Sequence, residues 1–257
     1  MRLATFNILH GRSLSDGAVH ADRLTAAVAE LDADVLGLQE VDRGQPRSGL
    51  LDLTEIAAKA LDAPVHRFAA AVAGTPGESW HPWSGDHDND HPLYGIALVS
   101  RWPVLHWQVT ALPPAPVRSP VYTPRAGIRL LKDEPRVLLA AVVQTPAGPM
   151  TVATTHLSFV PGWNLRQLHT AIRALRQLPA PRVLLGDLNL PAGPARLFSG
   201  WRPLARRATY PSPTPRAQLD HVLADPRGAD RLGRVVQIRT PRVGVSDHRP
   251  LVVQLEA

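Results

Sequence analysis

Polar side chains stand at the ends of short apolar runs at four places in this chain of 257 residues. Asp187 follows Val183–Leu185, for example, and His248 precedes Leu251–Val253. Such runs predict buried strands, and carboxylates or imidazoles at strand ends serve chemistry better than they serve stability. A fold that gathers these groups at one hydrolytic metal centre explains them most simply. The polar residues are Glu40, His156, Asp187, Asn189, Asp247 and His248.

The rest of the pattern predicts more strands than helices. Apolar residues recur at helical spacing over 22–31, 53–61 and 163–178. Hairpins mixed with crossovers favour an α/β (α+β) fold, in which two mixed sheets pack face to face with helices outside. The length suits one domain over residues 1–257, and the long segments 74–91 and 191–215 are expected to be loops. Strands are expected at 3–9, 35–39, 65–72, 94–100, 104–110, 126–131, 137–144, 150–155, 183–185, 219–223, 234–239 and 250–255.

Arginine supplies nearly all of the positive charge behind the net charge of +6, because Lys59 and Lys132 are the only lysines. A basic surface suits an anionic substrate such as nucleic acid, while a coding bias toward Arg, Ala and Pro explains the same composition without any function. The absence of cysteine excludes disulfides and thiolate ligands, which leaves oxygen and nitrogen ligands for a metal. No apolar stretch is long enough to span a bilayer, and the N-terminus lacks the features of a signal peptide, so a cytoplasmic protein is expected.

Taken singly, each polar residue also has an ordinary structural explanation. Asn7 lies in an apolar strand pattern, where an amide must be paired to be tolerated, and a hydrogen-bonded core Asn satisfies that pattern. Glu40 is either a ligand for a hard cation or a surface salt-bridge partner. Asp220 lies in another apolar strand and needs a partner there. Asp247 and His248 are neighbours on extended backbone, so their side chains should point to opposite sides and have separate roles.

Jointly, these residues match one family in their order, spacing and flanking sequence. The matching segments are Thr5-Phe6-Asn7, Leu38-Gln39-Glu40-Val41, Tyr94-Gly95-Ile96-Ala97-Leu98-Val99-Ser100-Arg101, Pro124-Arg125, Thr155-His156-Leu157, Gly186-Asp187-Leu188-Asn189, Leu219-Asp220-His221-Val222 and Ser246-Asp247-His248. With them the chain resembles the endonuclease/exonuclease/phosphatase superfamily, which includes pancreatic-type deoxyribonuclease and the exonuclease III-like repair nucleases. The resemblance covers the whole chain and implies a four-layer αββα sandwich, with the active site where the edges of the two sheets open.

The resemblance implies metal-dependent attack of water on phosphorus. Its metal would be Mg²⁺, with Mn²⁺ as an alternative. Glu40 would be the main ligand, with Asn7 beside it and Asp247 as a further ligand. In the repair nucleases an Asp follows the first-strand Asn by two positions, whereas this chain has Leu9 there. That departure argues against a second metal ligand at this point.

The resemblance also implies the roles of the catalytic residues. Asp187 would orient or deprotonate the attacking water. Asp220 would accept a hydrogen bond from His248 and so fix the tautomer of that ring. Donors to phosphate oxygens are expected from His156, His248, Asn189 and the guanidinium fork of Arg125. The residues expected to bind substrate are Arg125, Asn189, Tyr94 and Trp80.

Two substrate classes fit these catalytic residues. A nucleic acid would use arginines of segment 191–215 for backbone phosphates, and Trp80 and Trp83 for stacking on bases, although these tryptophans can equally cover the edge of the core. A small or lipid phosphate, such as an inositol phosphate or a phospholipid headgroup, is the alternative. A non-catalytic binding module is disfavoured because no catalytic position is missing. We therefore expect a monomer without a membrane span that binds an anionic phosphate substrate, with DNA or RNA favoured. The arginines expected to contact backbone phosphates are Arg202, Arg206, Arg207 and Arg216.

Overall fold

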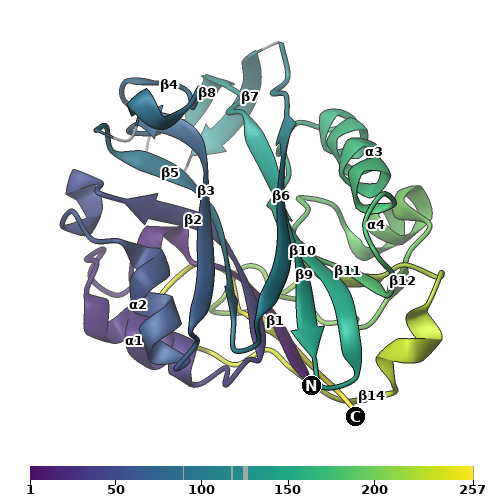
Figure 1. Cartoon of the computed structure of the whole chain (residues 1–257). Coiled ribbons are helices and arrows are strands. Elements are labelled where there is room, and N and C mark those ends of the chain that lie inside the picture. Colours follow the sequence, from purple (N-terminus) through teal and green to yellow (C-terminus); the bar gives the residue numbers. More distant parts are fainter. Residues whose placement is uncertain (89, 117, 124–126, 257) are drawn as a thin grey trace.

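Two β-sheets face each other in the computed structural model, which describes residues 1–88, 90–116, 118–123 and 127–256. Helices α1 and α2 lie outside one sheet, and α3 and α4 lie outside the other (Figure 1). This is the four-layer αββα sandwich expected from the sequence. None of the helices in the described residues is long and apolar enough to cross a membrane. The helices are α1 (Ala21–Ala29), α2 (Leu53–Ala60), α3 (Trp163–Leu175) and α4 (Ala192–Ser199), with 3₁₀ turns at Leu9–Gly11, Pro46–Ser48, Asp86–Asp88 and Ala229–Leu232.

The first sheet has seven strands in the order β14-β15-β1-β2-β5-β3-β4. Its centre joins distant parts of the chain, because β1 pairs antiparallel with β15 and parallel with β2. The polar end of β1 therefore lies beside residues from both ends of the sequence. The strands are β1 (Arg2–Asn7), β2 (Val35–Arg43), β3 (Val65–Gly74), β4 (Trp80–Pro82), β5 (Leu93–Ser100), β14 (Val235–Arg239) and β15 (Leu251–Leu255).

The second sheet has six strands in the order β12-β13-β11-β10-β9-β6. Strands β10 and β11 are parallel and place His156 in register with Asp187. Strand β13 is antiparallel to β11 and places Asp220 in register with the same Asp187. The three polar residues His156, Asp187 and Asp220 thus lie side by side at the same end of their strands. The strands are β6 (Val104–Leu112), β9 (Arg136–Thr145), β10 (Gly148–His156), β11 (Arg182–Asp187), β12 (Arg202–Pro203) and β13 (Asp220–Ala224), and a separate hairpin pairs β7 (Arg118–Thr123) with β8 (Gly127–Lys132).

Alternating side chains fill three apolar layers. One layer lies between the sheets and includes Leu3, Leu139 and Leu185, while the other two lie under the helix pairs. The sheets come very close at Gly37, where an added Cβ would lie 2.6 Å from Thr154 Oγ1. Only glycine lets β2 approach β10 this closely, so Gly37 helps to set the distance between the two halves of the polar edge.

The segment expected to be one loop over 191–215 contains helix α4 and strand β12, so that prediction was wrong. Gly193 and Pro194 obscured the helix, since both have low helix propensity, although Pro is tolerated in the first turn of a helix. Segment 74–91 likewise holds β4 and a 3₁₀ turn. Strand β2 also runs further than expected, to Arg43, because a bulge carries it past Gln39.

Candidate active site

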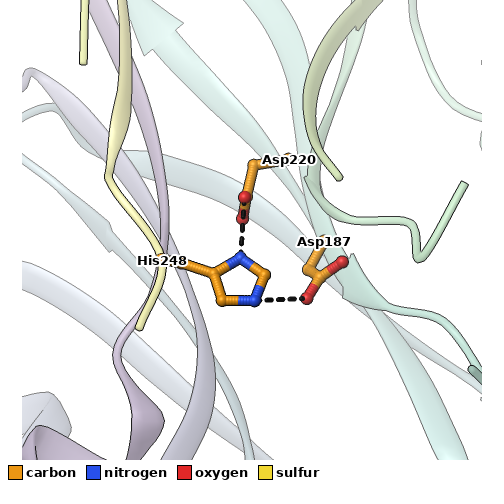
Figure 2. A group of neighbouring side chains, drawn as sticks. All are labelled: Asp187, Asp220 and His248. Carbon is orange, nitrogen blue, oxygen red and sulfur yellow. Dashed lines mark hydrogen bonds and ion pairs between the residues drawn. The ribbon is translucent and has the colours of Figure 1, made fainter. Parts of the chain in front are cut away.

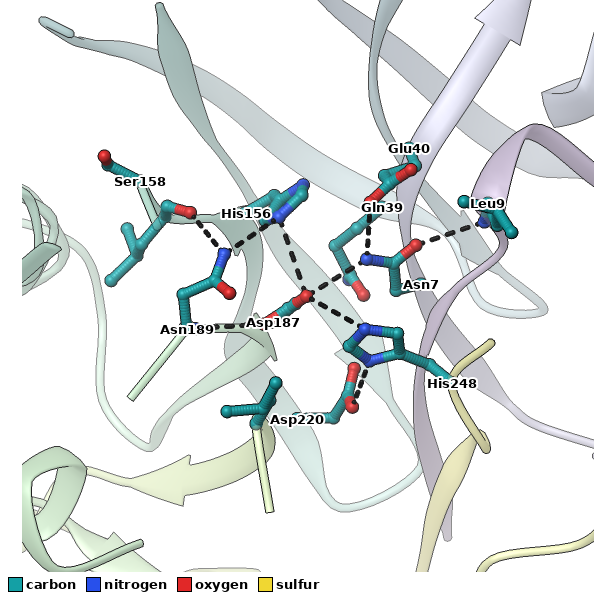
Figure 3. Close-up of polar contacts among 12 residues, drawn as sticks. Asn7, Leu9, Gln39, Glu40, His156, Ser158, Asp187, Asn189, Asp220 and His248 are labelled. Carbon is teal, nitrogen blue, oxygen red and sulfur yellow. Dashed lines mark hydrogen bonds and ion pairs between the residues drawn. The ribbon is translucent and has the colours of Figure 1, made fainter. Parts of the chain in front are cut away.

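Strand ends from both sheets meet in one polar group at an edge of the sandwich (Figure 3). From the first sheet come Asn7, the last residue of β1, and Glu40 in β2. From the second sheet come His156 and Asp187, the last residues of β10 and β11. The fold therefore brings together residues that lie far apart in sequence. The other members of the group are Asn189, Asp220 and His248, which come from β13 or from segments next to the strands, and the charge of Asp247 acts on Glu40 and His248.

Asn7 joins the two halves of the group through one amide. Its Nδ2 donates to Glu40 Oε1 at 2.9 Å and to Asp187 Oδ2 at 3.0 Å. Its Oδ1 accepts a hydrogen bond from the backbone N–H of Leu9 at 3.1 Å. Because both amide atoms are engaged, the orientation of Asn7 is fixed and the two carboxylates are held near one point.

Glu40 reaches the group because β2 is irregular there. The register with β5 shifts between Leu38 and Val41, and Glu40 has a left-handed φ of 55°. A bulge of this kind redirects a side chain out of the regular alternation. Burial, together with the negative charges of Asp247 and Asp187, raises the pKa of Glu40 to about 7, although the Asn7 hydrogen bond opposes the shift.

Asp187 is the centre of the group. Its Oδ2 lies 3.7 Å from His248 Nε2 (Figure 2) and 3.6 Å from His156 Nε2 (Figure 3). Its Oδ1 accepts a hydrogen bond from the backbone N–H of Asn189 at 2.9 Å. Burial raises the pKa of Asp187 to about 6, with the charge of His248 acting in the opposite direction. A carboxylate with this pKa is ionised near neutral pH and still basic enough to take a proton.

His248 is held by carboxylates on both sides. Its Nδ1 lies 2.8 Å from Asp220 Oδ2, and its backbone N–H donates to Ser246 Oγ at 3.0 Å. Burial alone would lower the pKa of His248, but the negative charges of Asp220, Asp187 and Asp247 raise it to about 10. His248 is therefore an imidazolium at neutral pH.

His156 has different neighbours. Its Nδ1 lies 3.1 Å from Arg136 Nη1, and its Nε2 lies 3.2 Å from Asn189 Nδ2. Burial lowers the pKa of His156 well below the ordinary value, and the positive charges of Arg136 and His248 lower it further. His156 is therefore neutral at the pH at which His248 is charged.

The backbone around the group adopts conformations that are uncommon for side-chain-bearing residues. Five of the eight non-glycine residues with positive φ in the described chain lie in or beside it, and backbone strain of this kind is concentrated at functional sites. Glycine is also needed just before Asp187, because Gly186 has φ of 147° and an added Cβ would lie 2.1 Å from Thr155 O. The five non-glycine residues with positive φ in or beside the group are Leu9, His10, Glu40, Asn189 and Ser246.

Glu40 and Asp247 provide carboxylates for a divalent cation, the hard ligands that Mg²⁺ prefers. Asn7 turns its Nδ2 toward Glu40 and its Oδ1 toward the N–H of Leu9, so its role as a further ligand stays a prediction. Burial is the main cause of the raised pKa of Glu40, and the nearby negative charges of Asp247 and Asp187 add to it, so a cation bound there would favour the ionised carboxylate. Asp187, Asp220 and His248 also present ligand atoms within 4.8 Å of one another. That trio fits less well, because a protonated His248 has no lone pair for a metal.

Of three further residues expected to bind substrate, Tyr94 lies beside the group, Trp80 lies away from it, and Arg125 lies outside the described part of the chain. Tyr94 is buried in β5, with Arg47 Cζ 5.4 Å from its ring centre, and it lines a narrow crevice together with His156. Trp80 packs on the apolar layer between the sheets, with Lys132 Nζ 4.9 Å from its ring centre. Arg125 lies outside the described residues. Substrate binding by these side chains stays a prediction.

Two residues that sequence reasoning missed contact the group. Arg136 reaches His156 from the start of β9. Tyr210 places its ring centre 4.8 Å from that of His248. No motif marks either residue, although an arginine directly before the long apolar run of β9 was a signal that could have been used.

Similar folds occur in solved structures. An endonuclease/exonuclease/phosphatase from Beutenbergia cavernae matches with a TM-score of 0.69 and 24% identity, over 98% of this chain and 70% of that one. A mannosyl-6-phosphatase from Bacteroides thetaiotaomicron matches with a TM-score of 0.63 and 15% identity, over 100% of both chains. Sphingomyelinase C from Streptomyces griseocarneus has a TM-score of 0.63 and 16% identity, over 100% of this chain and 99% of that one.

The sequence itself matches a family description. A search of curated proteins gave no match. The model of the Endonuclease/Exonuclease/phosphatase family matches residues 4–248. That range begins before Asn7 and ends on His248, so it contains the polar group described above. The chain therefore belongs to the endonuclease/exonuclease/phosphatase family, whose members are hydrolases of phosphate esters.

Proposed function

We propose that this protein hydrolyses phosphodiesters by in-line attack of water on phosphorus, with Mg²⁺ as its metal and nucleic acid as its favoured substrate. The observation that carries the reaction is Asp187, a carboxylate with a pKa of about 6 between two imidazoles of opposite charge state. A base with that pKa suits the orientation and deprotonation of water near neutral pH. Members of this family generally use divalent metal ions.

In this mechanism the residues align the phosphate and neutralise its charge. Asp187 Oδ2 holds the attacking water and accepts its proton. The His248 imidazolium, which Asp220 keeps charged and oriented, donates a hydrogen bond to a phosphoryl oxygen. Asn189 donates to the phosphoryl group from the opposite side of Asp187. Glu40, Asn7 and Asp247 would hold Mg²⁺, which when bound polarises a phosphate oxygen and offsets charge on the leaving group.

Arginines from α4, from β12 and from the segment after β12 support nucleic acid as the substrate. A groove of about 640 Å³ is lined by Arg196, Arg202 and Arg206, none of which has an ion-pair partner in the described part of the chain. Arg202 pairs with Ala224, at the end of β13 away from Asp220, and from there the chain runs toward Asp220 and reaches Tyr210 beside His248. Arginines along this path suit successive backbone phosphates.

A small or lipid phosphate remains the second candidate. Its support is that solved structures with this fold include proteins named as a mannosyl-6-phosphatase and a sphingomyelinase C. Such a substrate would use the same polar group and leave the arginine groove empty. The cytoplasmic location and the monomeric state expected from the sequence also remain predictions.

A hydrolysis screen with Mg²⁺ tests the proposal. Single-stranded DNA, double-stranded DNA, RNA, bis-nitrophenyl phosphate, inositol phosphates and phospholipid vesicles are compared, with Asp187→Ala as the inactive control. Cleavage of polynucleotides with steep salt dependence is the expected result. Turnover confined to small or lipid phosphates would contradict nucleic acid as the substrate. A metal titration tests Glu40 separately, because Glu40→Ala should need far more Mg²⁺ for half-maximal rate, and an unchanged titration would contradict its role as ligand.

A further inference from the structure

Arg136 is buried in a way that works against stability. Its side chain is 7% exposed, and the nearest carboxylate oxygen, Glu134 Oε2, is 3.7 Å from Nη2. Its Nε is buried without a hydrogen-bond partner among the described residues. Burying a guanidinium with so little compensation is costly. The close polar contact that Arg136 does make, at 3.1 Å, is with Nδ1 of His156.

That contact restricts the protonation of His156. A guanidinium has only donors and does not lose its proton in proteins. Nδ1 must therefore accept the hydrogen bond with its lone pair. A hydrogen on Nδ1 would point at another hydrogen, and an imidazolium would add a like charge to the same clash. The compatible form is the neutral ring with its hydrogen on Nε2.

The Nε2–H hydrogen then lies beside a second donor. Asn189 Nδ2 is 3.2 Å from Nε2 and donates one of its hydrogens to Leu157 O at 2.9 Å. Flipping the amide would set two oxygens against each other there, so Leu157 fixes its orientation. The remaining Asn189 hydrogen and the His156 hydrogen are thus neighbouring donors beside Asp187, and an anionic oxygen would satisfy both.

We propose that Arg136 is a positioning residue that holds His156 as the neutral Nε2–H tautomer, so that His156 serves as a fixed hydrogen-bond donor to a phosphoryl oxygen and not as a general acid. The donor role rests on the proposed function, while the tautomer does not. The two histidines then have different roles, since His156 donates without charge and His248 donates as a cation.

The tautomer is tested by NMR on the Mg²⁺-loaded protein with ¹⁵N-labelled histidine. His156 is assigned by its disappearance in His156→Gln. In the wild type, Nε2 should carry the hydrogen and Nδ1 should be bare at every pH from about 5 to 8, the span in which an ordinary histidine titrates. Arg136→Met should produce a mixture of tautomers, or a ring that titrates in this span. Arg136→Lys, which also offers only donors, should restore the wild-type tautomer.

Kinetics with bis-nitrophenyl phosphate test the donor role. Arg136→Met should lower kcat by about 10- to 100-fold, the range seen when a residue that orients a working imidazole is removed, with a smaller change in KM. Arg136→Lys should recover most of kcat. In a His156→Ala background, Arg136→Met should have little further effect, because both changes remove the same donor. The matched control is Arg182→Met, since Arg182 is an arginine of the same sheet whose side chain is only 12% exposed and pairs with Asp225 at 2.7 Å.

The outcomes separate the tautomer from the donor role. A wild-type His156 with its hydrogen on Nδ1, or one that becomes cationic between about pH 5 and 8, would overturn the proposal. So would additive effects of Arg136→Met and His156→Ala, or an equal loss of kcat in Arg182→Met. If the wild type hydrolyses no phosphodiester, the proposed function fails, and the NMR result still decides whether Arg136 sets the tautomer.

Discussion

His156 and His248 lie on opposite sides of the same carboxylate, but their surroundings give them opposite charge states. Nδ1 of His248 faces Asp220 at 2.8 Å, whereas Nδ1 of His156 faces Arg136 at 3.1 Å. Both rings are buried and both present Nε2 toward Asp187, at 3.7 and 3.6 Å. Burial lowers the pKa of both rings, so the charged residue behind each ring decides which of the two is protonated.

This difference teaches how one site can offer two kinds of donor at the same pH. A cationic donor lowers the energy of any nearby negative charge, while a neutral donor adds direction without adding charge. Having one of each leaves Asp187 ionised but still basic, with a pKa of about 6. Two cations would lower that pKa further, and two neutral rings would leave the phosphate charge less balanced.

Removing Asp187 should have the largest effect, because both imidazoles are arranged around it. Asp187→Ala should lower kcat by about 100- to 10,000-fold, the range for loss of a general base. Steady-state rates with bis-nitrophenyl phosphate measure this. Asp225→Ala, a buried carboxylate at the other end of β11 and β13, is the control and should stay close to wild type. A near-normal rate for Asp187→Ala would show that Asp187 is not the base that the two histidines serve.

Asp220→Asn should weaken only the cationic donor, His248, and leave the neutral donor, His156, unchanged. Without the carboxylate, the pKa of His248 falls from about 10. The variant should lose about 10- to 100-fold in kcat. Its remaining activity should decrease as pH rises through the new, lower pKa, because the cationic donor is then lost. Profiles of kcat against pH check this, with Asp225→Ala as the control that should keep the wild-type profile. Identical profiles for wild type and Asp220→Asn would refute the assignment.

Stability should respond to pH in opposite directions for the two rings. The folded pKa of His248 is above the unfolded value of 6.5, so its contribution is complete below pH 6.5 and is lost as pH rises toward about 10. The folded pKa of His156 is below 6.5, so its neutral ring destabilises the fold increasingly as pH falls below 6.5.

Urea unfolding in EDTA measures this difference for His156→Gln and His248→Gln. Relative to wild type, His248→Gln should be most destabilised at acid pH and less so above neutrality. His156→Gln should instead become relatively more stable as pH falls below 6.5. Each slope is at most about 1.4 kcal/mol per pH unit, the value for one proton. Parallel slopes for the two variants would show that the rings share one charge state.

Substitution of Tyr210 should have the smallest effect on kcat, and it tests whether this ring stabilises the His248 cation. Its ring centre is 4.8 Å from that of His248, where it can stabilise a cation by about 0.5–1 kcal/mol. Tyr210→Leu should therefore lower kcat only about two- to fivefold, as that energy implies, and shift the alkaline limit of activity slightly downward. Tyr210→Phe keeps the ring and should match wild type. A large loss in Tyr210→Phe would assign the effect to the hydroxyl instead.

Much of this arrangement followed from the sequence, because local patterns mark strands and their polar ends. The apolar run before Asp187 and the one after His248 became β11 and β15. The parallel pairing of β10 with β11 then puts His156 beside Asp187. Helix α4 was missed because its first turn contains Gly193 and Pro194, which local propensity assigns to a loop.

The partner of each histidine could not be read in the same way. Arg136 meets His156 only because β9 and β10 pair as a hairpin that ends at the polar edge. The bulge that turns Glu40 into the group is likewise set by pairing with β5. Contacts of this kind depend on tertiary register, which no single stretch of sequence encodes.

The position of β1 has a consequence for how the protein is made. Among the strands of this fold β1 leaves the ribosome first, yet one of its two neighbours in the sheet, β15, is synthesised after every other strand. Until then the growing chain leaves the backbone N–H and C=O groups along one edge of β1 unpaired. Folding of the first sheet must therefore wait for translation to pass residue 255, and the nascent chain should need protection from aggregation until β15 has been made.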